Sequence, residues 1–279
     1  MKVAACKYLV GEPRDFDAFA EKQAALLREA KAGGAQVAVL PEYLALELAA
    51  MFDADTRADL HASLAALQPL RAAWLALYAR LARDLGLWIN AGSFLLATGD
   101  GRYRNRSDLF APDGGHAWQD KLQLTGFERQ ARVIAPGEAL KVFEVCGARA
   151  GIAVCYDSEF PLPVHAQREA GARLLLVPSC TDTEAGATRV RVGCLARALE
   201  NRMFVAQAVT AGEAPWSPAL DVNTGEAALL APMDVGLPAD GVLAQTRGDA
   251  AWAIAELDFA ALEASAARAQ VANDRDWPG

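Results

Sequence analysis

Three residues of this sequence have side chains that could together carry out acyl-transfer chemistry. Glu42 and Lys121 come just past two predicted strands, which end at positions 40 and 120, and Cys155 is the last residue of a third. In open α/β sheets the working side chains gather beyond the carboxyl ends of the strands, where several chain segments meet at one crevice. A carboxylate, an ammonium and a thiol are the parts of an acyl-transfer site that needs no histidine. The combination predicts a cysteine nucleophile assisted by an acid and a cation.

Each of these residues also has a plain structural interpretation when it is taken alone. Glu42 fits a solvated loop acid, and Lys121 fits one half of a surface ion pair with Asp120. Cys155, at the end of an apolar strand, fits a buried thiol without chemistry. Only the combination of the three side chains favours a catalytic site.

The cysteines do not form a recognisable structural or metal-binding pattern. Their number is odd and no two of them form a CxxC pair, which argues against a disulfide framework or a zinc ribbon. We therefore expect free thiols, no metal site and no cofactor. The five cysteines are Cys6, Cys146, Cys155, Cys180 and Cys194.

The three histidines offer one alternative site. His61, His116 and His165 show no spacing to another nucleophile or to a metal ligand. His165 lies in a predicted helix after Cys155, so a Cys–His hydrolase built from these two residues is a less favoured alternative.

The composition excludes several classes of protein. The chain has 279 residues, of which 53% are hydrophobic, and a disordered chain could not leave so much apolar material unburied. A formal net charge of -8 repels phosphate backbones and anionic lipids, so we expect no nucleic-acid partner. No apolar stretch reaches membrane-spanning length, and charge interrupts the first apolar run too early for a signal peptide. We expect a cytoplasmic globular protein without a membrane partner.

The first half of the chain predicts an α/β fold with an antiparallel meander. Strand, helix and strand patterns alternate at 3–10, 15–32 and 35–40. Two helical patterns follow at 56–67 and 70–85, separated at Pro69 and closed by Gly86. Strands joined by glycine-containing turns are then predicted at 87–96, 104–111 and 116–120. A loop of about fifteen residues follows from Lys121, and loops of this length are usually functional or disordered.

The second half of the chain resumes the alternation of strands and helices. Cys155 is expected to be the last residue of its strand. No composition shift marks a domain boundary, so one domain over residues 1–279 is predicted. The predicted strands are 140–145, 149–155, 173–177, 203–209, 227–230 and 252–257, the helices are 163–170, 187–201 and 259–271, and the loops are 178–186 and 211–221.

Three separated motifs resemble those of the nitrilase superfamily of carbon–nitrogen hydrolases. The resemblance is clearest over residues 1–210, and the intervals between the motifs are of the size that this family shows. Gln123 stands where the family often has a histidine, which leaves the chemistry untouched. Residues 223–228 replace a Gly-Ser strand that is usual in the family. The motifs are Leu40-Pro41-Glu42 for the glutamate, Asp120-Lys121-Leu122-Gln123-Leu124 for the lysine, and Val154-Cys155-Tyr156-Asp157 with Phe160-Pro161 for the nucleophile.

The resemblance implies a fold and a set of catalytic roles. The family fold is a four-layer α-β-β-α sandwich, and its members usually associate through the outer helices, so a homodimer is expected. Glu42 would act as the general base and Cys155 as the nucleophile. Lys121, together with the backbone N–H of Tyr156, would hold the oxyanion.

Further residues are candidates for substrate binding. Glu128 resembles a second glutamate that orients the substrate in many members of the family, although a loop acid paired with Arg129 or Arg132 is nearly as good an interpretation. Cys180 and Asp182, in the loop after the strand at 173–177, are expected in the pocket wall. The resemblance assigns no role to residues after about position 210.

The predicted function is that of a thiol-dependent amidase. It would hydrolyse a small carboxamide through a thioester on Cys155 and release ammonia or an amine. Strict nitrilases in the family tend to follow the cysteine with Trp-Glu, whereas Tyr156-Asp157 follows it here and resembles the amidase pattern. The alternatives are a nitrilase, an acyltransferase that uses an amine as acceptor, and an inactive binding protein on the same fold.

Overall fold

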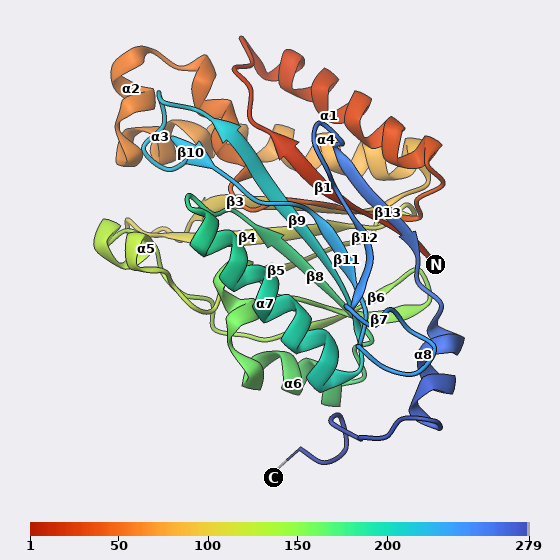
Figure 1. Ribbon diagram of the computed structural model, residues 1–279. Coiled ribbons are helices and arrows are strands. Elements are labelled where there is room, and N and C mark those ends of the chain that lie inside the picture. Colours follow the sequence, from red (N-terminus) through yellow and green to blue (C-terminus); the bar gives the residue numbers. More distant parts are fainter. Residues whose placement is uncertain (278–279) are drawn as a thin grey trace.

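The computed structural model describes residues 1–277 and has β1 (Lys2–Leu9) at the centre of its strands (Figure 1). On one side of β1 lie, in order, β2 (Val37–Leu40), β3 (Trp88–Ala97), β4 (Tyr103–Phe110) and β5 (His116–Asp120). On the other side lie β9 (Phe204–Glu213), β8 (Leu174–Ser179), β7 (Ala148–Ile152) and β6 (Val142–Val145). Shorter strands join this path, namely β10 (Val222–Asn223) and β11 (Ala228–Leu230) on β9, β12 (Val242–Gln245) on β11, and β13 (Trp252–Glu256) on β1.

The strands form two facing sheets because the partners of β1 change along its length. Val3–Ala5 pair with β2 in parallel register, and Lys2–Cys6 pair with β13 in antiparallel register. Lys7–Leu9 instead pair with β9. The two halves fold against each other, so that β2 contacts β8 and β9, and β3 contacts β8. A large part of the apolar core therefore lies between the two sheets.

Helices cover the outer face of each sheet. α1 (Phe16–Ala32) and α4 (Arg71–Leu85) pack together, and α4 contacts β3 and β4. α6 (Pro161–Glu169) and α7 (Glu184–Asn201) pack together on the other half, where α6 contacts β7 and α7 contacts β9 (Figure 1). The layers run helix, sheet, sheet, helix, which confirms the predicted four-layer sandwich.

Local sequence signals explain where the covering helices begin and end. The Asp15 carboxylate accepts the backbone N–H of Ala18 at 2.7 Å and caps the start of α1. The side chains of Phe19 and Leu27 on this helix are buried. α4 ends at Gly86, which has a φ of +59°, a conformation that glycine adopts without strain.

Shorter helices connect the layers. Of the helices within residues 1–277, none is long and apolar enough to cross a membrane. The α-helices are α2 (Ala54–Ala58), α3 (Leu60–Leu67), α5 (Gly126–Ala131) and α8 (Phe259–Ala266), and the 3₁₀ helices are η1 (Leu44–Met51), η2 (Gln68–Leu70) and η3 (Cys155–Glu159).

The structure corrects the sequence prediction around two of the candidate residues. β7 ends at Ile152 rather than at Cys155, because the chain turns after Val154 and Cys155 opens η3. The loop predicted after Lys121 contains α5, which starts at a capping box formed by Thr125 and Glu128.

Other corrections concern the ends of elements. The helix predicted at 56–67 is divided into α2 and α3, because the Asp59 carboxylate accepts the N–H of Ala62 at 2.8 Å and starts a new helix. β9 continues to Glu213 through residues predicted as loop, since β10 pairs with its end. α8 ends at Ala266, short of the predicted end, and η1 and β12 lie in segments for which no element was predicted.

Candidate active site

An irregularity in the neighbouring strand shapes the turn that carries Glu42. Gly92 lies in β3 at a shift of register against β4 and has a φ of +67°. A Cβ atom at this position would overlap the carbonyl oxygen of Pro41, so only glycine allows β3 to approach the turn so closely. The next residue, Ser93, accepts the backbone N–H of Tyr43 on its hydroxyl oxygen at 2.8 Å. Glu42 is thereby held between two residues that β3 fixes.

Lys121 follows the last residue of β5, as predicted, and its backbone is anchored on both sides. Its N–H donates to the carbonyl of Asn105 at 2.9 Å, and its carbonyl accepts the N–H of Gly137 at 2.7 Å. The side chain is buried, whereas Asp120 forms its ion pair with Arg106 at 2.7 Å. Lys121 is therefore not the surface partner of Asp120.

Cys155 lies at a sharp turn that is fixed by Asp157. Cys155 has a φ of +49°, which is unusual for a residue with a side chain and is found mainly where the surrounding structure enforces it. The Asp157 carboxylate accepts the backbone N–H groups of Val154 at 3.1 Å and of Gln123 at 2.7 Å. The segment after Lys121 is thereby tied to the turn that holds the thiol.

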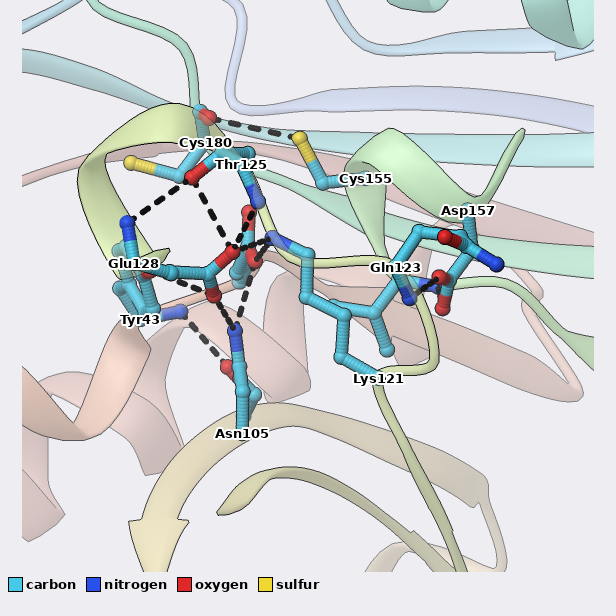
Figure 2. A network of polar contacts seen from close by, with 12 residues as sticks. Tyr43, Asn105, Lys121, Gln123, Thr125, Glu128, Cys155, Asp157 and Cys180 are labelled. Atoms are coloured by element: carbon cyan, nitrogen blue, oxygen red, sulfur yellow. Dashed lines mark hydrogen bonds and ion pairs between the residues drawn. The ribbon is translucent and has the colours of Figure 1, made fainter. Parts of the chain in front are cut away.

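The side chains of Glu42, Lys121 and Glu128 form a buried ionic cluster. Figure 2 labels Lys121 and Glu128 in it. The Lys121 Nζ lies 2.8 Å from Oε1 of Glu42 and 2.9 Å from Oε2 of Glu128. None of the three side chains is more than 1% exposed. One ammonium therefore faces two carboxylates away from water, and the cluster carries a net negative charge when all three groups are ionised.

Glu128 is held by several donors, which a loop acid on the surface would not be. It accepts the Tyr43 hydroxyl at 2.9 Å and the backbone N–H of Thr125 at 2.9 Å. Its ion pair is with Lys121, in place of the alternative pairing with Arg129 or Arg132.

Burial and charge together set the protonation of the cluster. Burial raises the pKa of the Glu42 carboxyl, an effect that Lys121 opposes and Glu128 reinforces. Burial alone would lower the pKa of Lys121, but Glu42 and Glu128 outweigh it and hold that pKa well above its usual value. Burial raises the pKa of Glu128, but Lys121 and the hydrogen bonds bring it below its usual value. Lys121 is therefore a permanent cation and Glu128 a permanent anion at neutral pH.

The Cys155 thiol is neutral in the resting site. Burial, followed by the charge of Glu42, raises the pKa of this thiol well above its usual value, while Lys121 opposes the shift. The sulfur donates to the carbonyl of Cys180 at 3.5 Å (Figure 2). Since the thiolate is the nucleophilic form, this thiol would need a base in order to react as a nucleophile.

Asn105 on β4 is a site residue that the sequence analysis missed. Its side-chain Nδ2 donates to Oε1 of Glu42 at 2.7 Å and to Oε1 of Glu128 at 3.2 Å. The asparagine lies between Arg104 and Arg106 in the sequence, and neither neighbour is fully buried. The alternation of side chains along the strand was a signal that could have pointed to Asn105 as the inward residue.

A cavity of about 260 Å³ opens onto Cys155. Glu42, Lys121 and Tyr156 are among the residues that line it. Cys180 and Asp182 also line it, at the positions expected of wall residues. The rest of the lining includes Phe127, Glu159, Arg189, Asp221 and Asn223. Within residues 1–277 no group of three or more His, Cys, Asp or Glu side chains is arranged to hold a metal ion.

The histidine alternative is not supported by the geometry. His165 Nδ1 lies 3.2 Å from Oδ1 of Asn201, and its ring stacks on Trp277 with centroids 4.1 Å apart. His116 Nε2 lies 3.0 Å from Oδ1 of Asp108. These contacts direct both rings to other parts of the fold.

The comparison with protein families agrees with this site. The model of the family described as Carbon-nitrogen hydrolase matches residues 2–238. The chain belongs to the carbon–nitrogen hydrolase family. This membership confirms the resemblance found in the three sequence motifs, and the matched region of this carbon–nitrogen hydrolase contains every residue of the ionic cluster as well as Cys155.

Relatives of this carbon–nitrogen hydrolase include enzymes named as hydrolases and amidases. The probable hydrolase YhcX of Bacillus subtilis is 31% identical over 173 residues, which cover 62% of this chain and 34% of YhcX. Deaminated glutathione amidase of Homo sapiens is 30% identical over 212 residues, which cover 68% of this chain and 59% of that enzyme. The matched segments thus span about a third and about three fifths of these two proteins.

Solved structures share the fold of this carbon–nitrogen hydrolase over nearly its whole length. Nit3 of Saccharomyces cerevisiae, a member of branch 10 of the nitrilase superfamily, has a TM-score of 0.76 at 20% identity and covers 99% of this chain and 97% of its own. An amidase from Nesterenkonia sp. has a TM-score of 0.71 at 23% identity, with coverages of 96% and 94%. At these identities the likeness shows the fold.

Proposed function

We propose that the protein is a thiol-dependent amidase that hydrolyses a small carboxamide to a carboxylic acid and ammonia or an amine. The observation that carries the proposal is the convergence of Glu42, Lys121 and Cys155 on one cavity. Two buried carboxylates around one ammonium are costly to assemble, and such clusters are characteristic of sites with chemistry to perform. The relatives that are named as amidases support the same reaction class.

The first half of the reaction forms a thioester and breaks the carbon–nitrogen bond. Glu42 takes the proton of the Cys155 thiol while the sulfur attacks the carbonyl carbon of the amide. Lys121 and the backbone N–H of Tyr156 stabilise the oxyanion, where one such donor is typically worth about 3 kcal/mol. Glu42 then gives its proton to the amide nitrogen, the carbon–nitrogen bond breaks, and the amine leaves.

The second half of the reaction returns the enzyme to its resting state. Glu42, again a carboxylate, takes a proton from a water molecule that attacks the thioester. The tetrahedral intermediate collapses, the carboxylic acid leaves, and the proton on Glu42 returns to the Cys155 sulfur. The reaction consumes only the amide and one water molecule. Glu128 acts as a fixed anion that holds Lys121 and would orient the substrate only through Lys121, because Glu128 is not among the residues that line the cavity.

The charges around the cavity favour amides whose far end is neutral or cationic. Lys121 and Arg189, the two cations of the lining, both face carboxylates, and Arg189 Nε lies 3.8 Å from Oε2 of Glu159. Asp182 and Asp221 add two more carboxylates to the lining. A carboxylate on the substrate would meet repulsion there, whereas an ammonium would be attracted.

The test is a comparison of matched amides and nitriles in an ammonia assay. Faster release of ammonia from the amides supports the proposal, and faster release from the nitriles favours a nitrilase. Transfer of the acyl group to an added amine, with no release of free acid, favours an acyltransferase. If iodoacetamide does not modify Cys155 in preference to the other four thiols, and no amide is hydrolysed, an inactive binding protein is favoured instead. The cytoplasmic location and the homodimer stay predictions.

A further inference from the structure

Among residues 1–277, Asn105 is the one neutral side chain that hydrogen-bonds to both carboxylates of the ionic cluster. The residue is 1% exposed. Its Nδ2 carries two hydrogens, so it can donate one to Glu42 and one to Glu128 at the same time. The reversed orientation of the amide would turn its oxygen toward two carboxylates and is excluded by repulsion. The direction of both hydrogen bonds is thus fixed by charge.

This arrangement leaves the oxygen of the Asn105 amide without a hydrogen bond among the described residues, and this is destabilising. In residues 1–277 its Oδ1 is buried without a hydrogen-bond partner. A buried polar atom without a partner costs about 1–3 kcal/mol, and folds retain such an atom where another requirement outweighs that cost. The arrangement that is retained here is the pair of bonds from Nδ2 to the two carboxylates.

These bonds select one oxygen of Glu42 for the thiol. Asn105 Nδ2 and Lys121 Nζ both contact Oε1 of Glu42, at 2.7 Å and 2.8 Å. With two donors on Oε1, the carboxylate is fixed against rotation, and Oε2 remains as the oxygen that can accept the thiol proton. Glu128, which holds the other hydrogen of Nδ2, prevents the amide from turning away.

We propose that Asn105 is a positioning residue that holds the Glu42 carboxylate in the orientation from which Oε2 takes the proton of Cys155. The proposal rests on the proposed function for the role of Glu42 as base. Asn105 is 1% exposed and is not among the residues that line the cavity, so it would act through Glu42 and not on the substrate directly. The backbone carbonyl of Asn105 accepts the N–H of Lys121. A substitution of the side chain leaves this backbone hydrogen bond in place, so it tests the side chain alone.

Asn90 provides a matched control for the test. It is a buried asparagine on the adjacent strand β3, and its Oδ1 also lacks a partner within the described residues. Its Nδ2 donates to the Ser107 hydroxyl at 2.8 Å instead of to the cluster. Replacement of either asparagine by alanine removes a comparable buried amide from the same sheet. Only Asn105→Ala removes a hydrogen bond from Glu42.

The experiment measures amide turnover and alkylation of Cys155 by iodoacetamide across pH in Asn105→Ala, Asn105→Asp and Asn90→Ala. For Asn105→Ala we expect kcat to fall by about 10- to 100-fold, the cost of a small misplacement of a catalytic group, with a much smaller change in KM. We also expect the acid limb of both profiles to move to higher pH, because Glu42 loses a donor to its charged form.

Asn105→Asp, which keeps the shape of the side chain but adds a carboxylate, should move the acid limb further in the same direction. Asn90→Ala should lower the Tm without moving the limb.

The outcomes separate this proposal from the proposed function. An unchanged acid limb in Asn105→Ala, with a loss of Tm and of kcat like that of Asn90→Ala, would overturn the positioning role. If Asn105→Ala does not fold, the nearly isosteric Asn105→Asp decides by the same readouts. The alkylation profile needs no substrate, so it tests Asn105 even if the wild-type protein hydrolyses no amide.

Discussion

The ammonium of Lys121 lies 2.8 Å from the carboxylate of Glu42, although 79 positions separate the two residues in the chain. The contact joins the ends of β2 and β5, two strands that lie apart in the sheet with β3 and β4 between them. In the proposed mechanism Lys121 serves two purposes, since it neutralises the buried Glu42 carboxylate and offers a cation to the developing oxyanion. Several consequences of this contact can be measured.

Replacement of Lys121 should remove activity even when the charge is kept. We expect Lys121→Arg to lower kcat by at least about 100-fold, because the planar guanidinium presents its donors with a different geometry from the compact ammonium. The ammonia assay measures this. Near-normal turnover in Lys121→Arg would refute the oxyanion role.

Loss of the Lys121 charge should also destabilise the fold. Lys121→Met leaves two buried carboxylates without a counter-ion, and breaking a buried ion pair in this way typically costs about 3–5 kcal/mol. Urea unfolding at neutral pH measures the effect. Because protonation of Glu42 relieves the repulsion with Glu128, the loss should become smaller as the pH falls, and a loss that does not depend on pH would contradict this explanation.

The pH profile should report the raised pKa of Glu42. The base must be ionised to accept the thiol proton, so activity is lost as the pH falls through the pKa of this carboxyl. Burial raises that pKa, so the acid limb of kcat/KM should lie above the range of an ordinary glutamate. Glu42→Gln should be inactive at every pH, and substantial turnover in this variant would remove Glu42 from the mechanism.

Gly92 should be required for the shape of the Glu42 turn. Gly92→Ala places a methyl group on the Pro41 carbonyl and should cost about 1–3 kcal/mol of stability together with most of the activity. Gly99→Ala is the matched control, since Gly99 also has a positive φ but a Cβ there meets no atom within 4 Å. Equal losses of activity in the two variants would show that backbone strain alone explains the effect.

The carboxylates of the cavity lining should set the charge preference. In a panel of amides of equal length, we expect kcat/KM to rise from a far-end carboxylate to a methyl group to an ammonium. Asp182→Asn and Asp221→Asn should each reduce the preference for the ammonium by about 2- to 5-fold, the effect of one exposed charge, and added salt should act in the same direction. Asp55→Asn, at an exposed position of α2, is the control. A preference for the carboxylate amide would contradict the argument.

The sequence patterns were sufficient to predict the alternation of strands and helices, and the family resemblance was sufficient to predict the four layers. The alternation of strand and helix patterns, and the position of Glu42 and Lys121 just after β2 and β5, follow from short-range apolar patterns that the structure confirms. The same patterns could not place the end of β7, because Ala153 and Val154 continue the apolar run while the bonds that turn the chain come from Asp157.

Asn105 shows why the rest of the site could not be read from the sequence. The alternation of side chains along β4 points Asn105 inward, but no local pattern shows that a buried asparagine bridges two acids. Its two partners, Glu42 and Glu128, come from a different strand and from α5, and only the folded chain brings them to one nitrogen. The capping box of Thr125 and Glu128, by contrast, is a visible signal that the sequence analysis did not use.

The most direct test of the account is the mass of the protein during turnover of an amide. The reaction is stopped with acid, and the masses of the intact protein and of its proteolytic peptides are measured by mass spectrometry. We predict an adduct with the mass of the substrate less ammonia on the peptide that contains Cys155, and loss of both the adduct and the turnover in Cys155→Ala, which should remain folded. Ammonia release by Cys155→Ala at a rate comparable to the wild type, or an acyl adduct on another cysteine, would contradict the account.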